Sequence, residues 1–150
     1  MKDRIEVKSK VTAQLIDAKT GKVVQESTQR NLITDVGENM LCYWTKGDIA
    51  TKGYVTHMSL SDESAAAQET ETTESGSNTG PRVAVTTSIS SDKITITGEW
   101  STAQANYTIR RGYLFSAASG GQLFATTALG SPFTKTSDYT FKLVWEITYS

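Results

Sequence analysis

Two residue types that support much of enzyme chemistry occur only once in this chain. Among 150 residues there is one cysteine, Cys42, and one histidine, His57. A single cysteine excludes an internal disulfide, and a zinc or iron site needs more nitrogen or sulfur ligands than the chain supplies. The lack of disulfides fits a reducing compartment. We therefore expect Cys42 to be a small core residue of a helix, and His57 to be an ordinary strand residue.

The sequence also lacks an excess of either charge and any long apolar run. It has 15 basic and 16 acidic side chains, and its formal net charge is -1. Proteins dedicated to nucleic-acid binding usually carry a basic excess or stripe, so we expect no nucleic-acid partner. No run approaches the roughly 18 apolar residues of a membrane span, and the opening residues MKDRIEVKSK do not resemble a signal peptide. We expect no membrane association.

Motifs for catalysis or cofactor binding are missing as well. There is no G-x-S-x-G nucleophile motif to recruit His57, and no glycine-rich loop with G-K-[ST] to hold a phosphate. The acidic stretch lacks the D-x-D-x-D-G spacing of a calcium loop. The sequence therefore predicts no enzyme activity, no cofactor, no catalytic residue and no metal ligand.

What the chain does contain points to β-structure. Proline is scarce, with 2 residues, whereas threonine and serine are abundant, and threonine favours strands while serine and glycine favour turns. Patterning predicts about eight to ten strands. The predicted strands cover residues 5–16, 22–28, 54–60, 82–89, 93–100, 106–117, 122–128 and 139–149, and GSPF at 130–133 is expected to interrupt the pattern at Pro132. The fold expected for residues 1–150 is one all-β domain, an antiparallel β-sandwich, with the jelly roll as one candidate arrangement.

The clearest strand lies at the C-terminus, in SDYTFKLVWEITYS. Large apolar residues occupy every second position there: Tyr139, Phe141, Leu143, Trp145, Ile147 and Tyr149. Such alternation is typical of a half-buried strand, and core packing is a better explanation than a carbohydrate-binding platform of aromatic rings. Val144 lies on the opposite parity, so we expect the second face to be partly covered, which a neighbouring subunit would do.

One short helix is predicted at about 34–45. Thr34 is a suitable N-cap residue, and Val36, Met40, Leu41 and Trp44 follow it at helical spacing. Gly47 is placed to end the helix. Gly37 lies inside the segment and lowers its helix propensity.

A long acidic loop is predicted at 61–82. It contains no large apolar residue, and a loop of this length in a compact domain is either disordered or functional. Two alternatives stand open: a solvated loop, or an arm ordered against a neighbouring subunit. Its acidic residues are the candidate partner-contact residues: Asp62, Glu63, Glu69, Glu71 and Glu74.

The order of several motifs over residues 31–150 resembles a known class of proteins. NLIT and GENML come first, followed by MSLSDESAAAQETE, ITITGEWSTAQANYTI, GYLFSAASGGQLFATT and finally KTSDYTFKLVWEITYS. This succession resembles small virion structural proteins of tailed bacteriophages, which occur as head decoration proteins and as tail-fibre or baseplate modules. The class often has a glutamate and an aliphatic residue before the G-L-F motif, where this chain has RRGYLF.

The resemblance implies a function without catalysis. A decoration, or cement, protein of this size binds the outside of the capsid in the virion and clamps subunits of the major capsid protein. It is a homo-oligomer, usually a trimer, and it is assembled in the host cytoplasm. The alternative implied by the same resemblance is a tail-fibre, baseplate or adaptor component involved in host attachment.

Overall fold

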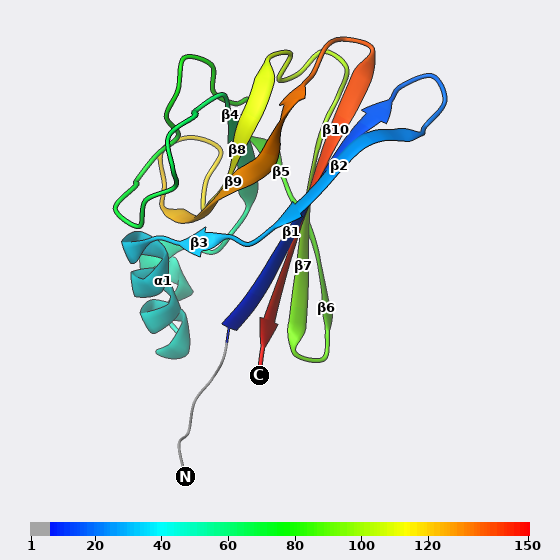
Figure 1. The fold of residues 1–150 in the computed structure, drawn as a ribbon. Helices are drawn as coiled ribbons and strands as arrows, with labels where there is room; N and C mark the ends of the chain where they lie inside the picture. The colour runs from blue at the N-terminus through cyan, green and yellow to red at the C-terminus, as the bar shows by residue number, and fades with distance from the viewer. Residues whose placement is uncertain (1–6) are drawn as a thin grey trace.

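Two antiparallel sheets packed face to face make up the protein (Figure 1). The computed structural model describes residues 7–150. The strands are β1 (Val7–Asp17), β2 (Val23–Gln29), β3 (Leu32–Ile33), β4 (His57–Ser61), β5 (Val83–Ala84), β6 (Thr86–Ser90), β7 (Lys93–Trp100), β8 (Thr108–Phe115), β9 (Leu123–Thr134) and β10 (Tyr139–Tyr149). Sheet A has the order β2-β1-β10-β7-β6, and sheet B the order β3-β9-β8-β4-β5. The predicted β-sandwich is confirmed; residues 5 and 6 of the first predicted strand lie outside the described residues.

The C-terminal strand is central, as its alternation indicates. β10 pairs with β1 on one side and with β7 on the other. Phe141, Leu143, Trp145 and Ile147 are buried against sheet B, while the residues between them are half-exposed. The alternate aromatic and aliphatic side chains of this strand therefore form the middle of the core.

The helix predicted at 34–45 is observed as α1 (Asp35–Thr45). The Thr34 Oγ1 accepts a hydrogen bond from the Gly37 amide at 2.9 Å, which is N-capping by a threonine side chain. A second helix, α2 (Ile49–Lys52), was not predicted; Asp48 caps it and Gly53 ends it. Four residues are too few for hydrophobic periodicity to reveal a helix. Neither helix of the described chain has the length and apolar character to span a bilayer.

The prediction that Cys42 is a core residue is wrong, because its side chain is exposed. Within α1 the buried residues are Gly37 and Met40. Cys42 is two positions beyond Met40 and so lies on the opposite side of the helix, at about 100° per residue. His57 is a strand residue of β4, as predicted, and its Nδ1 lies 2.9 Å from the Thr56 Oγ1.

Pro132 was expected to interrupt its strand, and it does not. β9 continues through it to Thr134. Pairing with β8 passes from Ala128, opposite Arg111, directly to Phe133, opposite Ile109. Pro132 therefore lies in a bulge, where the ladder does not need the amide N–H that proline lacks.

Gly37 lowers helix propensity, but its lack of a side chain lets α1 approach β9 closely. A Cβ at this position would lie 2.0 Å from the carbonyl oxygen of Phe124 and 2.9 Å from Cγ2 of Ile33. The first of these neighbours is backbone, which has no rotamer through which to move away. The packing distance between helix and sheet thus requires glycine here.

We predict that Gly37→Ala destabilises the protein by about 2 kcal/mol, because overpacking costs more than the roughly 1 kcal/mol that alanine gains in helix propensity. The measurement is the free energy of unfolding in urea. Gly130→Ala is the matched control, since the nearest atom to a Cβ there is 3.8 Å away. A G37A protein as stable as the wild type would show that α1 does not need this approach.

Candidate functional site

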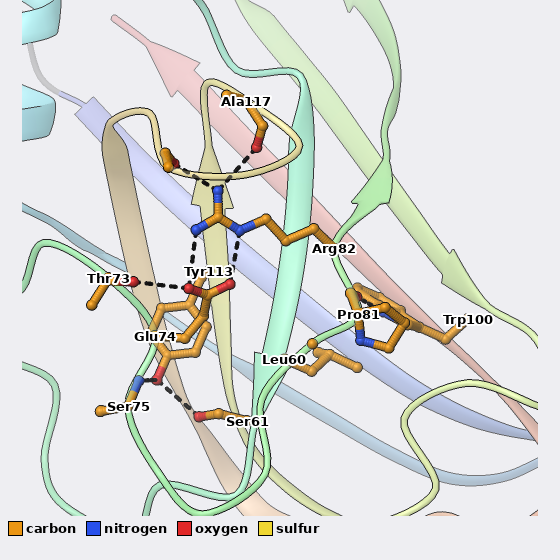
Figure 2. Close-up of polar contacts among 12 residues, drawn as sticks. Leu60, Ser61, Thr73, Glu74, Ser75, Pro81, Arg82, Trp100, Tyr113 and Ala117 are labelled. Carbon is orange, nitrogen blue, oxygen red and sulfur yellow. Dashed lines mark hydrogen bonds and ion pairs between the residues drawn. The ribbon is translucent and has the colours of Figure 1, made fainter.

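The acidic loop, residues 61–82, lies over the outer face of sheet B. β8 turns Arg111, Tyr113 and Phe115 toward this face, and Tyr113, Phe115 and Leu123 form a small second core on it. The Tyr113 hydroxyl is 2.8 Å from the Ser61 Oγ and accepts a bond from the Ser75 amide at 3.4 Å (Figure 2). A loop without large apolar residues thus covers an apolar cluster through polar contacts.

Glu74 and Arg82 hold one end of the acidic loop. The Arg82 guanidinium donates two hydrogen bonds to the Glu74 carboxylate, at 2.8 and 3.0 Å. It also donates to the carbonyls of Ala117 and Gly120, at 3.0 and 2.7 Å (Figure 2). Its Cζ lies 3.5 Å from the centroid of the Phe115 ring. One cation therefore joins the loop, the β8–β9 connection and the small outer core.

Glu71 and Arg111 hold the middle of the loop. The Arg111 side chain is buried and forms an ion pair with Glu71. It donates further to the carbonyl of Ala65 at 3.1 Å and to the Thr126 Oγ1 at 2.8 Å. Because removing one partner leaves a charge with little water around it, this pair fixes where the loop lies.

Asp62 and Glu63 bond to the loop itself. The Asp62 carboxylate accepts hydrogen bonds from the backbone amide and the side-chain amide of Asn78, at 3.0 and 2.7 Å. The bond from the Asn78 backbone amide is the main reason that the Asp62 pKa is lowered. The Glu63 carboxylate accepts from the Ala65 amide at 2.8 Å, which lowers the Glu63 pKa. Glu69 is exposed, and its carbonyl accepts from the Asp35 amide at the start of α1, at 2.9 Å.

The structure thus places four of the five candidate carboxylates against groups of their own chain. Only Glu69, among the five, presents an exposed carboxylate with no hydrogen bond or ion pair within residues 7–150. The loop is packed on its own sheet rather than simply solvated. That it contacts a partner stays a prediction. Among the described residues, no three or more His, Cys, Asp or Glu side chains are grouped to hold a metal ion.

A second surface, which sequence reasoning missed, is an apolar mouth at one end of the sandwich. It is a pocket of about 310 Å³ between the helical segment and the inner face of sheet A. The lining residues are Trp44, Gly47, Ile49, Tyr54, Val55, Thr87, Ile94, Ile96, Phe124, Ile147 and Tyr149. None of these carries a charge. In Figure 1 this is the end where α1 stands beside the lower part of sheet A.

The apolar mouth and the strand residues paired with its lining leave large hydrophobic side chains in water. Ile49 is 52% exposed and Tyr54 is 60% exposed on the helical side. On sheet A, Ile89 is 77% exposed and Val7 is 41% exposed. Val7 pairs with Tyr149 and Ile89 with Ile94, so both face the same side of the sheet as the lining residues. A single exposed hydrophobic residue is ordinary, but a cluster around a pocket is typical of a binding surface.

Glu74 generates a prediction about pH. Burial is the largest single effect and alone raises its pKa, but the hydrogen bonds from Arg82, from its own backbone amide and from neighbouring hydroxyls together outweigh burial and lower the pKa from 4.5 to about 2. The unfolded chain therefore takes up a proton at higher pH than the folded one, and stability is lost as pH falls from 4.5 toward 2. We expect Glu74→Gln to flatten this fall by about 1 kcal/mol, allowing for partial solvation.

The measurement is urea unfolding as a function of pH for the wild type, E74Q and the control Glu69→Gln, whose carboxylate is exposed. E69Q keeps the slope of the wild type. An E74Q protein with an unchanged slope would contradict the low pKa assigned to Glu74.

Arg111 generates a prediction with a control at the neighbouring position. Arg111→Met leaves Glu71 without its cation and removes two further bonds, which we expect to cost about 3 kcal/mol of unfolding free energy. Arg110→Met, which has no ion pair within the described chain, is expected to change stability by about 0.5 kcal/mol or less. Limited proteolysis checks the cause: cleavage within residues 61–82 accelerates in R111M and not in R110M. Equal effects of the two variants would contradict the role given to Arg111.

Comparison of the chain with protein-family models, with curated proteins and with solved structures finds no match.

Proposed function

We propose that this chain is a bacteriophage virion structural protein, a capsid decoration (cement) protein that binds the outer head surface and stabilises the shell through protein–protein contacts. The observation that carries the proposal is the apolar mouth with its rim of exposed hydrophobic side chains. Covering a surface of this kind with a protein partner is favourable, because apolar area is removed from water. The motif order over residues 31–150 supplies the phage context.

The rest of the molecule is suited to such a role. The acidic loop is fixed by two ion pairs and a set of hydrogen bonds, so the outer face of sheet B has a defined shape. A preformed surface loses less conformational entropy on binding than a mobile one. In a symmetric shell each copy of a decoration protein adds one interface, and the lattice multiplies that contribution.

The major capsid protein is the proposed partner. Stable interfaces usually bury about 1,200–2,000 Å² in total, which is more than the mouth alone provides. Contact with capsid subunits therefore extends beyond the mouth, and the exposed Glu69 of the acidic loop is a candidate for its polar rim.

The test is fractionation of particles from the phage or provirus that encodes the chain. We expect the protein in DNA-filled heads, and expect the purified protein to bind expanded shells that lack it. Its presence on isolated tails and absence from tailless heads would overturn the head location and favour the tail-fibre, baseplate or adaptor alternative.

Two variants test whether the apolar mouth is the surface that binds the shell. Ile49→Asp places a charge at the rim of the mouth and is expected to reduce shell binding at least tenfold. Val23→Asp is the matched control, because Val23 is a similarly exposed aliphatic residue (46%) on the distant edge strand β2. Equal binding of both variants would show that the mouth is not the contact.

A further inference from the structure

The strand β6 borders the apolar mouth and forms an edge of sheet A. It pairs with β7, and within residues 7–150 no strand pairs with its other side. All five of its residues, TTSIS, are exposed. Natural edge strands are usually protected from pairing by charges, proline or a bulge. Along Thr86–Ser90, β6 has no charged residue and no proline. Its register with β7 is unbroken, so it has no bulge either.

Two of the four edge strands in the described sheets, β3 and β5, are only two residues long. That leaves β2 and β6 as edges long enough to pair. If β2 paired antiparallel with a second copy of itself over its full length, Glu26 at its centre would face the same carboxylate of the partner. Like charges directly opposite each other destabilise a sheet. In β6 the central residue is Ser88, which brings no such repulsion.

We infer that β6 pairs antiparallel with β6 of a second copy of this chain, so that the two A sheets join across a twofold axis at the apolar mouth. This inference rests on the proposed function, which assigns binding to the apolar mouth. It adds that a second copy of the chain lies beside that mouth. It differs from the threefold arrangement that the resemblance implies, and the mass of the particle in solution decides between them.

The register follows from the faces of the strand. Thr87 and Ile89 lie opposite Ile96 and Ile94, so they face the mouth, whereas Ser88 lies opposite Thr95 on the outer face. Only one register pairs all five residues and keeps every side chain on its own face. It places Ser88 opposite the partner subunit's Ser88, and Ile89 opposite the partner subunit's Thr87.

This arrangement accounts for the most exposed hydrophobic side chain of those at the mouth. Ile89 is 77% exposed in the single chain. In the joined sheet it lies between Ile94 of its own subunit and a partner threonine, and its apolar surface is withdrawn from water. The two mouths then lie next to each other on the same side of a continuous sheet. The pairing is isologous, since each subunit contributes the same strand.

Mass measurement is the first experiment. Light scattering coupled to size-exclusion chromatography is expected to give twice the 16.3 kDa of one chain. Ile89→Lys is expected to give the mass of one chain, because it places a charge in the contact. Val24→Lys, a similar change at an exposed position (52%) of β2, keeps the dimer. A monomer or trimer at the highest soluble concentration of the wild type overturns the inference.

Cross-linking tests the register independently of stability. The exposed Cys42 is first replaced by serine. In that background Ser88→Cys places two thiols directly opposite each other, within the Cα separation of about 4.4–6.8 Å that a disulfide spans. Ser90→Cys is the control on the same strand and face, where the two thiols lie about 13 Å apart at strand rise.

We expect S88C to form a disulfide-linked dimer on mild oxidation and S90C to remain unlinked. Linking of both, or of S90C alone, contradicts the register. The outcome for the proposed function is separate. Suppose that the wild-type protein is monomeric and that I89K still loses binding to shells. Another virion protein would then pair with β6, and the decoration function would stand.

Discussion

Burial of the inner face of β10 is the constraint on which the other features depend. Its alternate residues Phe141, Leu143, Trp145 and Ile147 fill the space between the sheets. Because side chains alternate along a strand, a shift of one residue would expose all of them. β1 and β7 are aligned on this strand over most of their lengths. The position of β6, and therefore the edge beside the apolar mouth, follows from the same register through β7.

The outer face of sheet B is organised by a different kind of interaction. Tyr113 and Phe115 are buried there without an opposing sheet. The acidic loop covers them with carboxylates, hydroxyls and backbone groups, and two arginines supply the matching charges. The protein thus has one core made by hydrophobic packing and a smaller one sealed by polar bonds. The second depends on pH in a way that the first does not.

Much of the fold could be predicted because its signals are local. The alternation in β10 and the N-cap at Thr34 each depend on neighbours in sequence. Pro132 was misjudged because the bulge that accommodates it depends on pairing with β8. Contacts across the chain were beyond prediction: Glu71 finds Arg111 from 40 residues away. The apolar mouth was missed for the same reason, since Tyr54 and Ile89 each look like ordinary single residues until the fold brings them to one rim.

The anchoring of Arg82 has a consequence for how readily β6 can meet another chain. Just before β5 and β6, the Pro81 carbonyl accepts from the Trp100 indole at 2.9 Å, and the next residue, Arg82, holds four oxygens (Figure 2). The Val85 amide then bonds to the Thr56 carbonyl at 3.0 Å, one residue ahead of the strand. The free edge is therefore attached to well-fixed backbone at its start. In the proposed dimer, pairing along this edge would order few residues that are not already ordered, so the encounter of two subunits would be limited mainly by orientation rather than by rearrangement of the chain.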